Sequence, residues 1–178
     1  MSHEDKIRIH ALLDEVFTKG NLNYVHEVCT DDVELFTHVR PAPFVGPAGV
    51  MEFAGMIRGA FPDSRVEMHD LLSEGDLVAA RYTLHGTHLG SLAGLPATGS
   101  TVAVAIQEMF RLQDGRVREL RLKLDPMQVM QQIGVLPVSD GVPPALIMMA
   151  HVRRRIGHVR SLLRRVGDVL QPGAAARR

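Results

Sequence analysis

The chain has 178 residues, of which 46% are apolar and 22% are charged, with 20 Lys and Arg against 20 Asp and Glu. This length and balance fit one globular domain with an appendage and exclude a disordered chain. A single cysteine, Cys29, argues against an internal disulfide and a cysteine-rich metal site, because both need several thiols. A charged start and the lack of an uncharged apolar run near ~20 residues predict a soluble, cytoplasmic protein.

Charge is unevenly distributed along the sequence. Residues 1–141 hold 12 Lys and Arg but 19 Asp and Glu, a net −7, whereas residues 142–178 hold eight Arg and one Asp, a net +7. The sequence therefore predicts an acidic body and a basic tail.

The first 62 residues are predicted to be mainly helical. A helix over 2–19 has apolar residues at helical spacing and ends at the following glycine. A short helix is expected over 22–29, and then a strand over 33–38 in which apolar and polar residues alternate. A further helix starts after the Gly-Pro pair at 46–47 and ends within 59–62.

After residue 62 the spacing of apolar residues changes from about 3.6 residues, typical of a helix, to about 2 residues, typical of a strand. Four strands are predicted over 65–72, 76–86, 101–113 and 116–125. Asp114-Gly115 joins the last two as a hairpin turn. Helices followed by an antiparallel meander predict an α+β domain in which the N-terminal helices pack on one face of a curved sheet.

Short motifs follow one another in order over residues 10–137. They are Phe36-Thr37-His38, Gly46-Pro47-Ala48-Gly49-Val50, Phe61-Pro62-Asp63, Gly86-Thr87-His88, Gly94-Leu95-Pro96-Ala97-Thr98-Gly99, Phe110-Arg111-Leu112, and Asp125 with Gln132-Ile133-Gly134. In this order and spacing they resemble the SnoaL-like polyketide cyclase family.

The resemblance implies a cone-shaped α+β barrel, the architecture shared with ketosteroid isomerase and scytalone dehydratase, with an apolar pocket closed by the N-terminal helices. It also implies cofactor-free acid/base chemistry. In this chemistry a carboxylate removes a carbon-bound proton, and an intramolecular aldol reaction closes a ring in a polyketide-like, hydrophobic carbonyl substrate. Relatives on the same fold perform other reactions or none, so the fold alone does not decide the activity.

Asp125 and His38 are the candidate catalytic residues. Asp125 ends the last strand and matches an aspartate of the family's final motif, where an apolar pocket would raise its pKa toward that of a general base. It could instead cap the helix expected over 126–133, or do both. His38 ends the first strand and could transfer a proton near neutral pH, or only fix the loop that follows.

Five further residues are candidates for substrate binding: Arg81, His88, Glu108, Phe53 and Met109. Arg81 binds an oxygen of the substrate if it faces inward, but alternation in its strand favours an outward, solvated charge. His88 would hold the Gly-rich loop or react. Glu108 interrupts an apolar strand face, which indicates either a pocket carboxylate or an ion pair at a dimer interface. Phe53 and Met109 would contact a flat apolar substrate.

One departure from the family motif favours a second function. Family cyclases usually carry Glu-His-Trp before the final aspartate, and some have their catalytic acid directly after the Trp. Here the run is Glu119-Leu120-Arg121, and Leu122 occupies the acid position. The alternative function is therefore a non-catalytic protein that binds a hydrophobic ligand or a partner.

No metal or nucleotide site is predicted. His85 and His88 have no third ligand at a recognisable spacing, and the Gly-rich loop lacks the Lys-Ser/Thr that ends a phosphate-binding loop.

Residues 138–178 form a predicted second segment after a family domain over 1–137. Apolar residues from Ala145 to Leu170 repeat at alternating spacings of four and three, which predicts a helix with a packing seam and a basic outer face. Docking on the acidic body of the same or a second subunit is expected, with no nucleic acid or membrane partner. We therefore expect a homodimer in which this helix takes part.

Overall fold

We describe residues 3–137 of the protein from a computed structural model. The chain begins with helix α1 (His3–Leu13), which continues into a π-helical stretch η1 (Asp14–Lys19) that ends at Gly20. Helix α2 (Tyr24–Val28), strand β1 (Cys29–Phe36) and the short strand β2 (Phe44–Val45) follow. Helix α3 (Gly46–Ala60) completes the first half.

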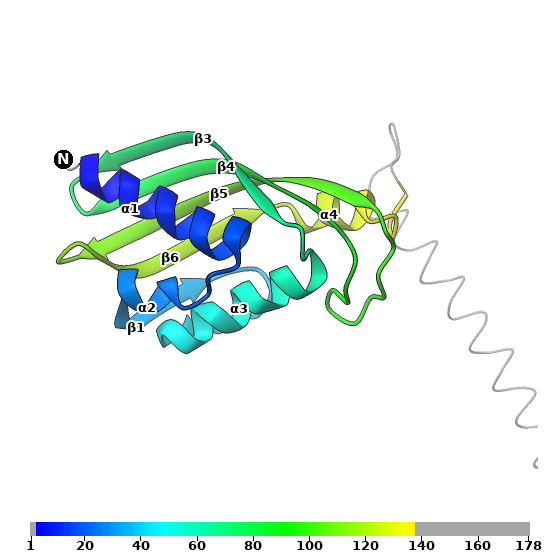
Figure 1. Ribbon diagram of the computed structural model, residues 1–178, viewed down its shortest axis with the longest axis horizontal. Helices are drawn as coiled ribbons and strands as arrows, with labels where there is room; N and C mark the ends of the chain where they lie inside the picture. The colour runs from blue at the N-terminus through cyan, green and yellow to red at the C-terminus, as the bar shows by residue number, and fades with distance from the viewer. Residues whose placement is uncertain (1–2, 138–178) are drawn as a thin grey trace, which may run out of the picture. The chain divides into compact units, whose positions relative to one another are not determined.

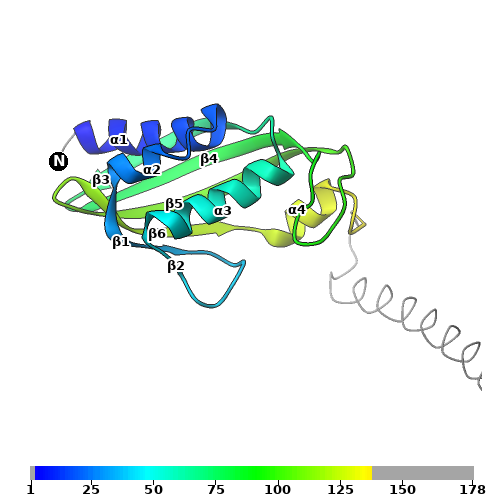
Figure 2. The same cartoon turned by 60° about the horizontal axis from the view of Figure 1, so that its bottom comes forward.

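The second half of the described chain is mostly sheet. It contains β3 (Arg65–Glu74), β4 (Leu77–Thr87), β5 (Thr101–Gln113) and β6 (Arg116–Leu124), and then the short helix α4 (Pro126–Gln132). Within residues 3–137 these strands form one six-stranded sheet in the order β2-β1-β6-β5-β4-β3. The sheet is curved and does not close, and α1, α2 and α3 cover one of its faces (Figures 1 and 2). The predicted α+β class, with N-terminal helices packed on a curved sheet, is confirmed.

The buried core lies between these helices and the inner face of the sheet. Strand β5 shows the reason, because its residues alternate strictly between exposed and buried along its whole length. The apolar residues of its buried face, from Val102 to Leu112, pack against apolar residues of the helices such as Ile9, Leu13 and Phe53. Glu108 lies in the same buried row.

Two details of the predicted fold are corrected. The sheet is not antiparallel throughout, because β1 pairs in parallel with β6, with Leu35 opposite Leu120. Cys29 does not end a helix but begins β1, where it pairs with Val117. The pairing with a distant strand extends the chain at this point, although the local sequence continues a helical pattern.

The loop between β4 and β5 is fastened to the end of α3. The backbone N–H groups of Leu89 and Gly90 both donate to the carbonyl oxygen of Ala60, at 3.0 and 3.1 Å. A Cβ atom at position 90 would overlap the carbonyl oxygen of Gly59, so only glycine fits this approach. The attachment fixes the loop, which supplies Leu92 and Ala93 to the cavity described below.

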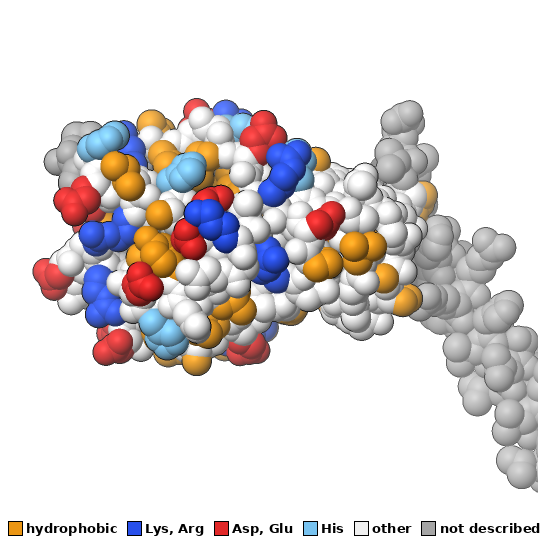
Figure 3. All heavy atoms as spheres, in the orientation of Figure 1, with side chains coloured by type: hydrophobic (Ala, Val, Ile, Leu, Met, Phe, Trp, Pro, Cys, Tyr) orange, Lys and Arg blue, Asp and Glu red, His pale blue; other side chains and the backbone are white. Residues whose placement is uncertain are grey.

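The helix-covered face differs in polarity along its length. Side chains of both charge signs are interspersed around α1, whereas the end toward α4 and the β4–β5 loop shows few charges and several apolar side chains (Figure 3). None of the helices within residues 3–137 has the length and hydropathy of a transmembrane span. The helix predicted over 145–170 lies outside the described residues.

Candidate functional site

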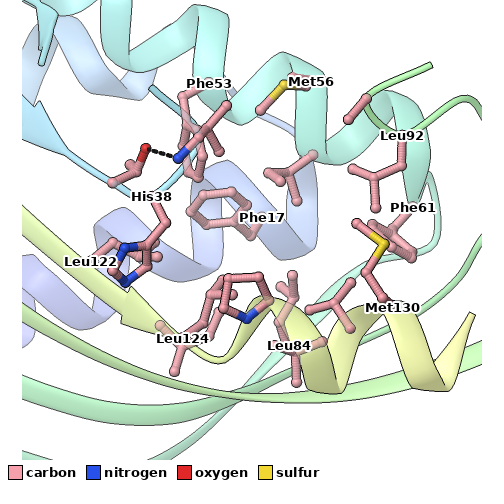
Figure 4. A pocket seen from close by; sticks show the side chains of 18 of the residues that line it. Phe17, His38, Phe53, Met56, Phe61, Leu84, Leu92, Leu122, Leu124 and Met130 are labelled. Atoms are coloured by element: carbon pink, nitrogen blue, oxygen red, sulfur yellow. Dashed lines mark hydrogen bonds between the residues drawn. The ribbon is translucent and has the colours of Figure 1, made fainter. Parts of the chain in front are cut away.

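A cavity of about 280 Å³ lies between the helices and the inner face of the sheet. We call it the main cavity. Its walls come from η1, α3, α4, the β4–β5 loop, strands β4 to β6 and the residues that follow β1. Figure 4 shows Phe53 and Met56 of α3 with Phe17 on one side, Leu122 and Leu124 of β6 on another, and Leu92, Phe61 and Met130 at the far end. The site is therefore suited to a hydrophobic ligand.

Few polar side chains interrupt this apolar lining. His38 and Tyr82 are the titratable side chains among the described residues that line the main cavity. His38 lies two residues beyond the end of β1, beside Leu122 and Leu124 (Figure 4). Tyr82 projects from the inner face of β4 and is 1% exposed. Among the described residues, these two groups are therefore the candidates for proton transfer in the main cavity.

A second, more polar depression lies on the outer face of the sheet, and we call it the outer groove. It has a volume of about 400 Å³, and its lining includes His38, His69, Arg81, Lys123 and Asp125. His38 lines both the main cavity and the outer groove. It therefore lies where the apolar interior meets a polar surface.

Asp125 lies in the outer groove and not in the main cavity. Its side chain is exposed, and its Oδ1 accepts a hydrogen bond of 2.9 Å from the backbone N–H of Met127. Asp125 thus caps the N-terminus of α4, with Pro126 at the first helical position. The expectation that an apolar pocket surrounds this carboxylate is wrong, because the chain turns into α4 immediately after β6.

The remaining predicted residues are divided between the two faces of the sheet. Phe53 lines the main cavity. Arg81 faces outward and forms an ion pair with Asp70 at 2.5 Å, and Met109 is 47% exposed on the same outer face. The alternation of side chains along β4 and β5 therefore directs Arg81 and Met109 away from the main cavity.

His88 is buried but does not line the main cavity. Its Nδ1 lies 3.1 Å from Oγ1 of Thr98, and its backbone N–H donates to the carbonyl oxygen of Ser100 at 2.9 Å. Its ring contacts Phe61 with centroids 5.5 Å apart. These contacts join the start of the β4–β5 loop to its end.

Glu108 is a buried carboxylate on the inner face of β5, 3% exposed. The hydroxyl of Tyr82 donates a hydrogen bond of 2.8 Å to its Oε2. Burial raises the pKa of Glu108 to about 7, and the hydrogen bond from Tyr82 offsets part of that rise. The sequence pattern singled out Glu108, but it did not indicate Tyr82, because a tyrosine in an apolar row looks like an ordinary core residue.

Comparisons with known proteins agree on one family. The family described as "SnoaL-like polyketide cyclase" matches residues 7–133. The chain is 29% identical over 114 residues to nogalonic acid methyl ester cyclase from Streptomyces nogalater, covering 59% of this chain and 85% of the relative. It is 29% identical over 130 residues to an aklanonic acid methyl ester cyclase from Streptomyces peucetius, covering 65% and 87%.

Solved structures give the same result. A SnoaL-like protein from Jannaschia sp. CCS1 superposes with a TM-score of 0.69 at 26% identity, over 75% of this chain and 94% of that one. A SnoaL-like polyketide cyclase from Agrobacterium tumefaciens, at 22% identity, shares the fold with a TM-score of 0.62 over 75% of this chain and 100% of that one. The family match spans well over half of the sequence. The chain therefore belongs to the SnoaL-like polyketide cyclases, a family of enzymes.

Proposed function

We propose that the protein closes a ring in a hydrophobic, polyketide-like carbonyl substrate by a cofactor-independent intramolecular aldol reaction in the main cavity. The observation that carries this proposal is the cavity itself, which is apolar, about 280 Å³ in volume and in contact with an ionisable side chain, His38. Curated relatives at 29% identity are cyclases of polyketide methyl esters, which supports the same substrate class here.

The reaction requires one proton to leave carbon and one to arrive at oxygen. A base takes a proton from the carbon between two carbonyl groups, and the resulting enolate attacks another carbonyl carbon of the same molecule. One carbon–carbon bond forms, and the new alkoxide takes up a proton. An apolar cavity favours this step because it holds the flexible chain folded and excludes competing water.

In this proposal His38 is the group that exchanges the proton with the substrate. It lines the main cavity, whereas Asp125 is exposed and lines only the outer groove. A well-solvated carboxylate is a weak base for a carbon acid. In this proposal Asp125 contributes a negative charge on the solvent side of the groove that it shares with His38.

A non-catalytic, ligand-binding function is the alternative, and one observation favours it. Leu122 lines the main cavity at the position where some family members have an acid, so the cavity wall is apolar there. With His38 and Tyr82 as the titratable groups among the described residues of its wall, the cavity is also suited to storing or carrying a hydrophobic ligand.

Turnover of a polyketide methyl ester distinguishes the two functions. We expect the purified full-length chain to convert nogalonic acid methyl ester or aklanonic acid methyl ester into an isomer of unchanged mass, detected by chromatography with mass spectrometry. Heat-denatured protein controls for spontaneous cyclisation. Binding of either ester without rate enhancement over that control would contradict the enzymatic function and support the ligand-binding one.

We further propose that the protein is a homodimer that uses the outer face of the sheet. The strand register places Leu72, Ala79 and Met109 in one row across β3, β4 and β5 on this face, and Leu72 is 68% exposed. An exposed apolar row on a sheet favours association with another surface. Met109→Glu in the full-length chain should shift light scattering from dimer toward monomer, whereas Ile7→Glu, at an exposed apolar position on α1, should not. A dimer that survives Met109→Glu would contradict this interface.

A further inference from the structure

Glu108 has an unusual environment for a carboxylate. It lines a small cavity of about 20 Å³ whose other walls are apolar side chains of α1, η1, α2, α3, β1 and β6. The titratable groups that face it from the packed elements are Tyr82 of β4 and Cys29 of β1. Burial raises the pKa of the Cys29 thiol to about 12, so this neighbour is neutral. None of the ion pairs found in the described part of the chain supplies a cation to Glu108.

Tyr82 connects this carboxylate to the main cavity. The tyrosine lines the main cavity, and its hydroxyl reaches Oε2 of Glu108 at 2.8 Å. Phe17 and Phe53 line both the main cavity and the small one. The hydrogen bond between Tyr82 and Glu108 therefore lies near the boundary between the two cavities.

The pair has two proton arrangements with different consequences for the main cavity. When Glu108 is ionised, it can only accept, so the Tyr82 hydroxyl donates its hydrogen to the carboxylate. When Glu108 is neutral, its own O–H can donate to the oxygen of Tyr82. The tyrosine hydrogen is then free for another acceptor.

We propose that Tyr82 binds a carbonyl oxygen of the ligand in the main cavity through its hydroxyl, and that Glu108 is the positioning residue that directs this hydroxyl by donating a hydrogen bond to it. The inference rests on the proposed function only in assuming that a carbonyl compound occupies the main cavity. Tyr82 then orients the substrate, and an enolate oxygen formed during the reaction is stabilised by the same donor.

The rest of the cavity explains why such a donor is needed. A carbonyl oxygen buried without a donor loses its hydrogen bonds to water, which costs free energy. His38 lies just after β1 and Tyr82 lies in β4, so the two side chains line the main cavity from different elements. Tyr82 is thus a second polar contact for an elongated ligand whose other end lies near His38.

The proposal predicts that a ketone binds more tightly when Glu108 is neutral. The matched probes are 1-tetralone and tetralin, two-ring compounds that differ in one carbonyl group, and equilibrium dialysis measures their dissociation constants. For the unmodified full-length protein, the affinity for 1-tetralone should fall about 5-fold to 10-fold between pH 6 and pH 8.5, the value of one hydrogen bond. The affinity for tetralin should stay constant, which controls for other effects of pH on the cavity.

Variants assign this pH effect to the pair. Tyr82→Phe should lower the affinity for 1-tetralone at pH 6 by the same factor and leave tetralin unchanged. Glu108→Gln, whose amide donates at every pH, should keep the high affinity at pH 8.5. His38→Gln should preserve the pH effect, which excludes the other titratable group of the cavity wall. The carbonyl stretch of bound 1-tetralone at pH 6 should lie at lower frequency in the unmodified protein than in Tyr82→Phe.

Three results would overturn the inference: equal pH responses of the two probes, a pH effect that survives in Glu108→Gln, or failure of both probes to bind. Neither probe has a second carbonyl group to react with, so binding is independent of cyclisation. Discrimination between the probes without turnover of polyketide esters would overturn only the proposed function. Turnover without discrimination would overturn only the role of Tyr82 and Glu108.

Discussion

Glu108→Gln is expected to make the protein more stable at pH 8 by on the order of 3 kcal/mol and to leave its stability at pH 4 nearly unchanged. Burial raises the pKa of Glu108 from 4.5 to about 7, so the native state keeps the proton over a range in which the unfolded state has lost it. The stability contributed by the neutral carboxyl is fully present below pH 4.5 and is lost as pH rises through about 7. A pKa difference of one between the native and unfolded states corresponds to ~1.4 kcal/mol, and glutamine resembles the neutral form at every pH.

Urea unfolding at a series of pH values from 4 to 8 measures this effect. Subtracting the variant from the unmodified protein removes the contribution of the histidines, which both chains share. Glu67→Gln is the matched control. This exposed carboxylate has its pKa lowered by a hydrogen bond with His85, so its replacement should give no gain at pH 8. Parallel stability curves for the unmodified protein and Glu108→Gln would show that Glu108 is ionised in the native state at low cost.

The meander of the fold could be predicted from the sequence because its strands have one buried face. Strand β5 was expected over residues 101–113 and has these bounds, since every second side chain must be apolar to cover the core. The hairpin at Asp114-Gly115 followed from turn chemistry, and both residues have positive φ angles there. Local signals of this kind depend on few residues and need no knowledge of distant partners.

The first strand shows that local sequence signals do not determine every element of the fold. Residues 22–29 continue a helical pattern, yet Cys29 belongs to β1 because it pairs with Val117, far along the chain. The parallel pairing of β1 with β6 has no local signature, since it depends on how the helices and the sheet fold together. It also decides where β1 ends, at Phe36, and so leaves His38 at the wall of the main cavity.

The sequence predicted which residue types form the candidate site, but not the direction in which their side chains point. The alternation of β5 identified Glu108 as a carboxylate in an apolar row, which the structure places opposite Leu122 of β6. Its partner Tyr82 lies on a different strand, and only the register of β4 and β5 brings the two side chains together. Asp125 was expected inside because it ends the last predicted strand and matches an aspartate of the family's final motif, but the turn into α4 carries its side chain to the surface.

His38→Gln is expected to lower the turnover number of ring closure about 100-fold to 10,000-fold, with a much smaller change in KM. Loss of a general base typically has an effect of this size, and glutamine fills a similar volume without accepting a proton. Asp125→Asn should reduce turnover about 10-fold or less, because asparagine caps α4 as well as aspartate does and the lost charge acts only through the solvated outer groove.

Steady-state kinetics on nogalonic acid methyl ester compares the two variants with His26→Gln, a control at an exposed histidine of α2 that lines neither the main cavity nor the outer groove. Thermal unfolding of all three variants verifies that they are folded. If Asp125→Asn loses more turnover than His38→Gln, then the carboxylate is the base and must reach the substrate by a rearrangement of the turn into α4. If both variants turn over at the rate of His26→Gln, the proton leaves the substrate by another route, and Tyr82 is the remaining titratable side chain of the main cavity that could take part.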